Sequence, residues 1–147
     1  MRIEMMTAAH ETAVLEMMRE FYASPAVLSN GSEEIFQADI AACVSAEPWL
    51  EGYVFTEGET LMGYAMVARS FNCEYGRPCR WIEDLYILPA HRGRGIGGAF
   101  LDHIAAKYPD SLLRLEAEEE NEGAVALYRR HGFEPFPYME MKRMPQA

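Results

Sequence analysis

A run of glycines and arginines at residues 91–98 has the composition of an anion-binding turn. Four glycines within six residues would weaken a helix, but they let successive backbone N–H groups approach and point at one anion. The amphipathic helix expected next would direct its unpaired N–H groups at the same place. The segment predicts a diphosphate site, with a flexible loop as the weaker alternative. The candidate residues are Arg92, Gly93, Arg94, Gly95, Ile96, Gly97 and Gly98.

The same glycines also fit a dinucleotide-binding pattern. Gly93, Gly95 and Gly98 match G-x-G-x-x-G, and Glu116 and Glu118 lie near the position of a ribose-binding acid. The turn, however, follows about half of the chain instead of opening it. What remains is too short for the repeated strand–helix units of a dinucleotide domain, so a nicotinamide dinucleotide site is a minor alternative.

The bulk composition limits the classes of partner. Half of the 147 residues are apolar, which is enough for one compact domain over residues 1–147. No apolar run approaches the roughly 18–20 residues of a membrane helix, and the start lacks the plan of a signal peptide. We therefore expect a soluble cytoplasmic protein without a membrane partner. The net charge of −10 disfavours a nucleic-acid partner and suits a cationic substrate, although it can also simply maintain solubility.

The cysteines and histidines do not indicate a metal site. Cys43, Cys73 and Cys79 lack the paired short spacings of zinc ligands. The four histidines occur singly along the chain. We therefore expect no metal.

Two helices are expected in the first third of the chain. Thr7 can cap a helix whose apolar residues from Val14 to Phe21 follow the spacing of one helical face. Ser32, followed by two glutamates that suit a helix start, can cap a second helix, which Pro48 would end.

The middle of the chain predicts strands that belong to a mixed sheet. Tyr53–Phe55 and Leu61–Val67 flank a glycine turn and form an antiparallel hairpin. Trp81–Leu88 has the apolar composition of a buried strand, and Leu112–Ala117 is a strand that follows the helix after the glycine turn. A strand–helix–strand unit of this kind makes its two strands parallel.

The end of the chain completes the expected fold. Asn121 can cap a last helix that ends at Gly132, and a short terminal strand pair is expected at Phe133–Phe136 and Tyr138–Lys142. The fold class is therefore α/β, with four helices around a mixed sheet.

Three stretches together resemble the GNAT superfamily of acetyl-CoA-dependent N-acetyltransferases. Trp81–Pro89 is similar to the family's central strand, Arg92–Gly97 fits its R-x-x-G-x-G pyrophosphate motif, and Asn121–Phe133 resembles its last conserved helix. These motifs cover roughly residues 81–133. The resemblance implies a single N-acetyltransferase domain. Its mixed, mostly antiparallel sheet would have a splayed parallel strand pair and about four flanking helices.

The resemblance also implies binding roles. In this family a bulge splays the central strand from its parallel neighbour, and the pantetheine arm of acetyl-CoA fits the slot like an added strand. Leu85 and Ile87 would offer backbone groups to the pantetheine and thioester, and the amides of residues 93–98 would hold the pyrophosphate. Asn121 is similar to the residue that bonds the pantetheine arm, and it can equally be a plain helix cap.

Two side chains are candidates for catalysis. An aliphatic amine with a pKa near ~10 must lose a proton before it attacks a thioester. Glu83, in an apolar strand, is the first candidate for the base, directly or through a water, because desolvation would raise its pKa. Asp84 is the second, and both can instead be strand-edge charges satisfied by arginines. Tyr128, two helical turns after Asn121, resembles the family tyrosine that protonates the departing thiolate; a packed core tyrosine is the alternative.

The acceptor is predicted as a chemical class. Glu83–Tyr86, together with Tyr128, is similar to the diamine (polyamine) acetyltransferases, and five glutamates cluster where the strand after the coenzyme helix ends. They are Glu116, Glu118, Glu119, Glu120 and Glu122. We therefore expect direct transfer from acetyl-CoA to a small cationic primary amine in a ternary complex, with ribosomal-protein, amino-acid and aminoglycoside acceptors still open. A coenzyme A-binding regulatory module without catalysis is the alternative, and the resemblance is compatible with a homodimer.

Overall fold

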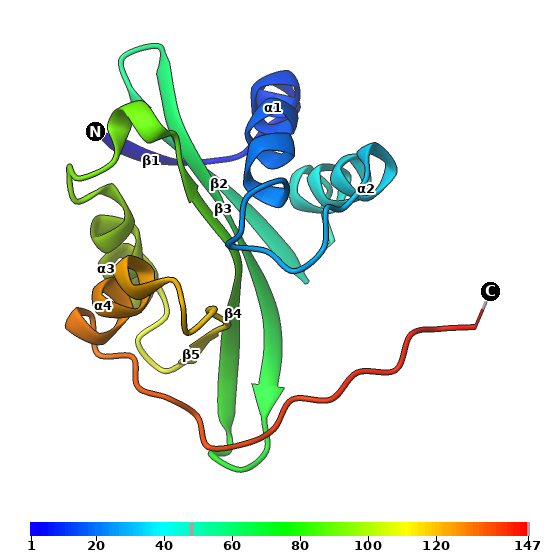
Figure 1. The fold of residues 1–147 in the computed structure, drawn as a ribbon, viewed down its shortest axis with the longest axis vertical. Helices are drawn as coiled ribbons and strands as arrows, with labels where there is room; N and C mark the ends of the chain where they lie inside the picture. Colours follow the sequence, from blue (N-terminus) through cyan, green and yellow to red (C-terminus); the bar gives the residue numbers. More distant parts are fainter. Residues whose placement is uncertain (48, 147) are drawn as a thin grey trace.

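The computed structural model describes residues 1–47 and 49–146, and a five-stranded sheet forms the centre of this part of the chain (Figure 1). The strands β1 (Arg2–Met5), β2 (Leu50–Glu57), β3 (Thr60–Asn72), β4 (Arg77–Ile87) and β5 (Leu112–Leu115) lie side by side in that order. The first four pair antiparallel, and β4 pairs with β5 in parallel. The prediction of a mixed, mostly antiparallel sheet is confirmed.

Helices cover both faces of the sheet (Figure 1). The helices α1 (Glu11–Tyr22) and α2 (Glu33–Val44) lie on one face, and α3 (Ile96–Lys107) and α4 (Glu122–Arg130) lie on the other. The prediction of four helices around the sheet is confirmed for the described residues. In this part of the chain, no helix has both the length and the apolar character needed to span a membrane.

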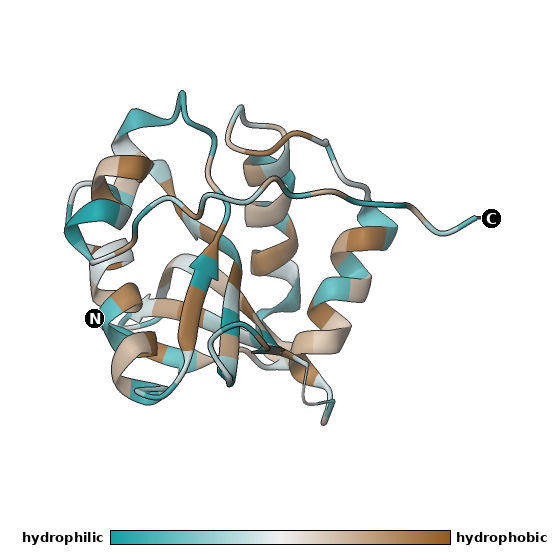
Figure 2. Cartoon of the chain, turned by 90° about the horizontal axis from the view of Figure 1, so that it is seen from below, coloured by the Kyte–Doolittle hydropathy of each residue, from teal (hydrophilic) through white to brown (hydrophobic). Residues whose placement is uncertain are grey.

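The two faces of the sheet bury separate hydrophobic cores. On β2, Val54 packs in the core under α1 and α2, whereas Tyr53 and Phe55 pack in the core under α3. This alternation follows from the two-residue period of a strand, which points successive side chains to opposite faces. Figure 2 shows hydrophobic and hydrophilic residues alternating along the helices, as expected for elements that bury one side.

The helix starts follow the predicted caps, with one shift. Ser32 caps α2, because its Oγ accepts a hydrogen bond from the backbone N–H of Ile35 at 3.2 Å. Thr7 instead precedes a short 3-10 helix, Ala8–His10, and α1 begins only at Glu11. Pro48, the predicted end of the second helix, lies outside the described residues.

A β-bulge interrupts β4 at Glu83. Met66 on β3 lies opposite Asp84, while the next residue, Val67, lies opposite Ile82. Glu83 is therefore an extra residue without a partner on β3, which is the definition of a bulge. The parallel pairing of β4 with β5 also stops at Ile82. Beyond the bulge the two parallel strands separate, as the resemblance implied.

The predicted terminal strand pair is wrong. Phe133–Phe136 and Tyr138–Lys142 form neither helix nor strand, and the C-terminal end projects from the body of the molecule (Figures 1 and 2). Pro135 and Pro137 explain the difference, because proline has no N–H to donate to a neighbouring strand. Alternate apolar residues alone are not enough to make a strand here.

Side chains hold the first half of this C-terminal segment, which we call the tail (residues 133–146). The ring of Phe136 lies edge-to-face with that of Tyr75, with 6.4 Å between ring centres. The hydroxyl of Tyr138 donates to the carboxylate of Glu74 at 2.6 Å. Both partners belong to the turn between β3 and β4, so the tail is anchored on that hairpin.

A substitution at Gly63 tests the close approach of β3 and β4. A Cβ at this position would overlap the carbonyl oxygen of Tyr86, a backbone atom that cannot move aside without disturbing the sheet. We expect Gly63→Ala to lower the free energy of unfolding by about 1–3 kcal/mol, measured by urea denaturation.

Gly123→Ala is the matched control for this prediction. A Cβ at Gly123 meets nothing within 4 Å, and a helix favours alanine over glycine. This control should be neutral or stabilising. Equal urea midpoints of unfolding for the two variants would contradict the register of β3 and β4.

Candidate active site

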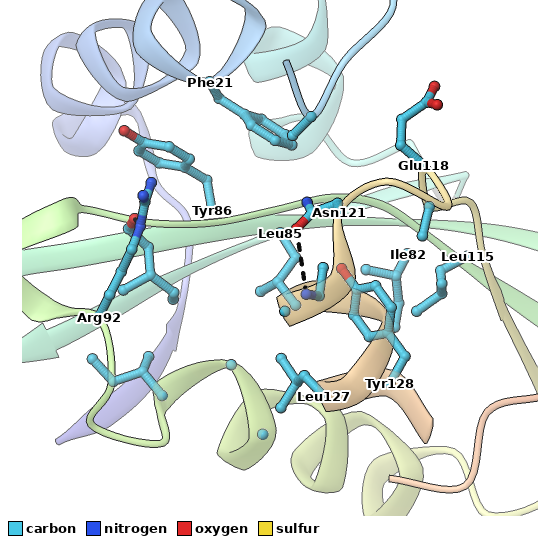
Figure 3. A pocket seen from close by; sticks show the side chains of 18 of the residues that line it. Phe21, Ile82, Leu85, Tyr86, Arg92, Leu115, Glu118, Asn121, Leu127 and Tyr128 are labelled. Carbon is cyan, nitrogen blue, oxygen red and sulfur yellow. Dashed lines mark hydrogen bonds between the residues drawn. The ribbon is translucent and has the colours of Figure 1, made fainter. Parts of the chain in front are cut away.

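A cavity of about 970 Å³ opens where β4 and β5 separate (Figure 3). Its walls come from β4, the end of β5, the glycine turn with the first residues of α3, one side of α4, and the loop after α1. All the predicted site residues except Arg94 line it. They are Glu83, Leu85, Ile87, Arg92, Gly93, Gly95, Ile96, Gly97, Gly98, Asn121 and Tyr128.

The glycine turn presents backbone N–H groups to the cavity. Gly93 and Gly95 have φ angles of +76° and +77°, in the left-handed region that favours glycine. Gly95 precedes α3 and caps it with no side chain. The first hydrogen bond within the helix runs from the N–H of Ala99 to the carbonyl of Gly95, at 3.0 Å. The amides before Ala99 therefore have no partner inside the helix and are available to an anion.

Gly97 and Gly98 allow α4 to pack closely on α3. A Cβ on Gly97 would lie 3.2 Å from Cδ2 of Leu127, and one on Gly98 would lie 2.6 Å from Nε2 of His131. The His131 ring is itself fixed by a contact of 2.9 Å between its Nδ1 and Oδ1 of Asp102 on α3. These two glycines therefore position the cavity wall formed by α4, in addition to offering their amides.

The two arginines of the turn point in different directions. Arg94 forms an ion pair with Glu57, with 2.6 Å between Nη2 and Oε2, and ties the turn to the β2–β3 hairpin. Arg92 donates from Nε to the carbonyl of Ile87 at 2.9 Å, and its guanidinium lies 5.5 Å from the centre of the Tyr86 ring (Figure 3). Of the two, only Arg92 offers its side-chain charge to the cavity.

Leu85 and Ile87 lie in the part of β4 that β5 leaves unpaired. Their partners on β3 are Ala65 and Gly63, so one edge of β4 is bonded within the sheet. The opposite edge faces the cavity, where Arg92 engages only the carbonyl of Ile87. Such an edge can receive an extended ligand through backbone hydrogen bonds, as an added strand does.

Carboxylates gather at the other end of the cavity. Glu83 is exposed to the cavity at the bulge, but the protein around its carboxylate removes part of its hydration. This desolvation is the first cause of the raised pKa of Glu83, and the charges of Asp84 and Glu140 follow. The pKa of Glu116 is raised first by a hydrogen bond with the side chain of Glu140 and then by burial. Carboxylates therefore dominate this end of the cavity. The glutamates that line it are Glu83, Glu116, Glu118 and Glu120.

These acids are not arranged as a metal site. Within residues 1–47 and 49–146, no three His, Cys, Asp or Glu side chains are grouped so that they could hold a metal ion. The contribution of Glu140 from the tail has no signal in the sequence, because the residue lies 24 positions after Glu116 in a segment without regular structure.

The side chain of Asp84 points toward α1 and β3 and not into the cavity. Its side chain is buried, with 5% of the residue exposed, and it does not line the cavity. The hydroxyl of Tyr22 donates to its Oδ1 at 2.8 Å, and that of Tyr64 donates to its Oδ2 at 2.7 Å. The sequence did not indicate these tyrosine partners, since they belong to a distant helix and a distant strand.

Two polar side chains of α4 face the cavity. Asn121 caps the helix, because its Oδ1 accepts from the N–H of Ala124 at 3.3 Å, which leaves its amide nitrogen for a ligand. Tyr128 is half-buried, with its ring edge-to-face against Phe133, and Figure 3 shows its hydroxyl pointing into the cavity. A tyrosine hydroxyl already holds its proton at neutral pH, and burial raises the pKa of Tyr128 further above its ordinary value.

Comparison with known proteins gives one family. The model of the acetyltransferase (GNAT) family matches residues 13–133. The chain is 33% identical to thialysine N-epsilon-acetyltransferase of Bos taurus over 79 residues, 52% of this chain and 46% of that enzyme. It is 34% identical to N-alpha-acetyltransferase RimI of Mycobacterium tuberculosis over 80 residues, 52% of this chain and 48% of that enzyme. Each match thus covers less than half of the relative's length.

The fold is shared with solved acetyltransferase structures. The aminoglycoside N-acetyltransferase AAC(6')-Iy, in complex with CoA, aligns with a TM-score of 0.78 over 97% of this chain and 93% of its own. The sequence identity of 16% is low, so this likeness concerns the fold alone.

Proposed function

The chain belongs to the acetyltransferase (GNAT) family, and we propose that it transfers the acetyl group of acetyl-CoA to a small cationic primary amine. The observation that carries this proposal is the order of groups along one cavity. Backbone amides and Arg92 lie at one end, a free strand edge lies in the middle, and carboxylates lie at the other end. An anionic coenzyme and a cationic acceptor would thus enter from opposite ends.

The residues of the cavity fit acetyl-CoA. The amides before Ala99 and the guanidinium of Arg92 suit a diphosphate, and the unpaired edge at Leu85 and Ile87 suits the amide-bearing pantetheine arm. The amide nitrogen of Asn121 could donate to the same arm. Acetyl-CoA would supply an acetyl group activated as a thioester.

A dinucleotide site has less support. The turn follows four of the sheet's five strands in the described residues, and the only parallel pair is β4 with β5. A dinucleotide-binding domain instead opens with its turn and builds a mostly parallel sheet.

Glu83 has the properties of the general base. An ammonium group must lose its proton before it can attack a thioester, and a carboxylate with a raised pKa accepts that proton more readily. Glu83 lines the cavity, whereas Asp84 is buried, does not line the cavity and is engaged by two tyrosines. These positions favour Glu83 over Asp84, acting directly or through a water.

Tyr128 has the properties of the general acid. Its hydroxyl faces the cavity, is protonated at neutral pH, and projects from the same side of α4 as Asn121. A proton donated to the departing sulfur would make coenzyme A the better leaving group. Positioning of the two substrates would supply much of the remaining rate.

The acidic end supports a cationic acceptor. Glu116, Glu118 and Glu120 line the cavity, whereas Glu119 and Glu122 are exposed outside it. Glu122 instead lies in the first turn of α4, where an acidic side chain suits the helix dipole.

An acceptor screen tests the proposed function directly. We expect the purified protein to acetylate small diamines ahead of neutral amines, with kcat/KM falling as salt rises. Exposed charges lose their reach beyond about 10 Å at 0.1 M salt, which is the reason for the fall. Acetyl-CoA affinity is measured at each salt concentration as the control.

Two other results of the screen would change the proposal in different ways. Binding of acetyl-CoA without turnover of any amine would favour a coenzyme A-binding module. A neutral or acidic acceptor that outcompetes every diamine at low and high salt would contradict the cationic acceptor only.

A substitution in the turn tests the coenzyme end. Gly95→Ala strains the backbone at φ +77° and displaces the amides before α3, so we expect coenzyme A affinity to fall about 10-fold. Calorimetry measures the affinity, and the thermal shift produced by coenzyme A, but not by NAD, supports the ligand's identity. Gly76→Ala is the matched control, because it has a φ of +61° in the β3–β4 turn, outside the cavity. Equal coenzyme affinity in the two variants would remove the turn from the site.

Removal of the Tyr128 hydroxyl tests its proposed role as the general acid. Tyr128→Phe keeps the ring against Phe133, so we expect kcat to fall by about 100-fold or more while the Kd of acetyl-CoA changes less than about twofold. Tyr108→Phe removes a hydroxyl bonded to Glu51, away from the cavity, and should leave kcat unchanged. Full turnover of Tyr128→Phe across the pH range would make Tyr128 a packing residue.

A further inference from the structure

Asp84 is a buried carboxylate without a cationic partner among the described residues. Its two hydrogen bonds come from the neutral hydroxyls of Tyr22 and Tyr64, and none of the ion pairs in this part of the chain includes it. Burial raises the pKa of Asp84, although the two tyrosines oppose this rise. A charge removed from water in this way costs stability, so its presence calls for another explanation.

The register of β4 supplies that explanation. In an uninterrupted strand, Ile82, Asp84 and Tyr86 would share one face, because side chains alternate with a period of two. In the protein, Ile82 packs in the core under α3, whereas Tyr86 packs in the core under α1 and α2. Asp84 contacts Tyr22 and Tyr64, which also belong to the α1–α2 side. The face changes at one place only, at the extra residue Glu83.

We propose that Asp84 is a positioning residue, which is held by Tyr22 and Tyr64 on the α1–α2 face and thereby fixes the bulge that directs Glu83 into the cavity. One tyrosine comes from α1 and the other from β3, so the carboxylate is fixed from two elements. A one-residue slip of β4 would break both hydrogen bonds and turn Glu83 away from the cavity. This inference rests on the proposed role of Glu83 as the base.

The same carboxylate also acts on Glu83 through its charge. The pKa of Glu83 is raised by burial first and by Asp84 second, and Glu140 of the tail adds to the effect. The other titratable groups around this cluster are Asp39 and Cys43 on α2, Tyr22 on α1, Tyr64 on β3 and Glu116 after β5. Burial and the charges of Asp84 and Glu83 raise the pKa of Asp39 to about 6. Asp84 thus both aims the base and increases its basicity.

The first test removes the charge of Asp84 and keeps its shape. In Asp84→Asn, we expect the acid limb of the pH profile of kcat/KM to move to lower pH, because one of the charges that raises the pKa of Glu83 is lost. The Kd of acetyl-CoA should stay within about twofold. A structural role alone would not move the acid limb.

Asp84→Asn should not destabilise the fold at neutral pH. The folded pKa of Asp84 is raised, so the folded state binds more protons than the unfolded state just above the ordinary aspartate pKa. Stability is therefore lost as pH rises through this window, and asparagine removes the loss. We expect an equal or higher Tm at pH 7.

The second test removes the hydrogen bonds and keeps the carboxylate. In the double variant Tyr22→Phe and Tyr64→Phe, we expect the plateau of kcat to fall by roughly 10–100-fold, because Glu83 is no longer held in place. Tyr53→Phe is the matched control, since it removes a buried hydroxyl that bonds Lys107 in the other core. It should leave kcat and the acid limb unchanged.

The outcomes separate this inference from the proposed function. In one outcome, Glu83→Gln loses the acid limb, while Asp84→Asn and the double tyrosine variant both behave like the wild type. This outcome would overturn the positioning role of Asp84 and leave Glu83 as the base. An unchanged acid limb in Glu83→Gln would show that Glu83 is not the base, and the positioning role of Asp84 would fall with it. If Asp84→Asn does not fold, the double tyrosine variant decides.

Discussion

The strand β4 cannot pair with both of its neighbours along its whole length, and the rest of the structure depends on this constraint. Its bulge at Glu83 keeps the ladder with β3 continuous on either side but ends the ladder with β5 at Ile82. The separation creates the cavity, leaves one edge of β4 without a strand partner, and moves the following side chains to the opposite faces. One inserted residue therefore supplies a wall, a binding edge and a candidate base.

The sequence predicts best those features whose cause is local. The glycine turn follows from residues within one short segment, and its positive φ angles at Gly93 and Gly95 are what such a composition allows. The caps at Ser32 and Asn121 satisfy N–H groups only three residues away. The order of strands and helices after residue 50 follows from periodicity. The bulge could be predicted only from the family resemblance, because neither Glu83 nor Asp84 indicates a change of strand register in the sequence.

Features that depend on distant partners could not be predicted. Arg94 has the composition of an anion ligand, yet its direction is set by Glu57, 37 residues earlier. The hydroxyl that holds Asp84 from α1 comes from 62 residues away, and Glu140 joins the acids from a segment that was expected to be a strand. The strand Arg2–Met5 is too short to show a periodic pattern, and it exists because β2 provides a partner. Contacts of this kind leave no local trace in the sequence.

The short last strand offers little length for pairing with another molecule. β5 lies at the edge of the sheet, and an open edge is a template on which another chain can add a strand. It has only four residues, Leu112–Leu115, and one of them is Arg114, whose guanidinium lies over the rings of Trp81 and Phe136. The prolines at 135 and 137 also keep the tail of a second molecule from pairing along a continuous ladder. The same prolines that deprive the fold of two strands thus make the tail a poor strand to add to the open edge of another molecule.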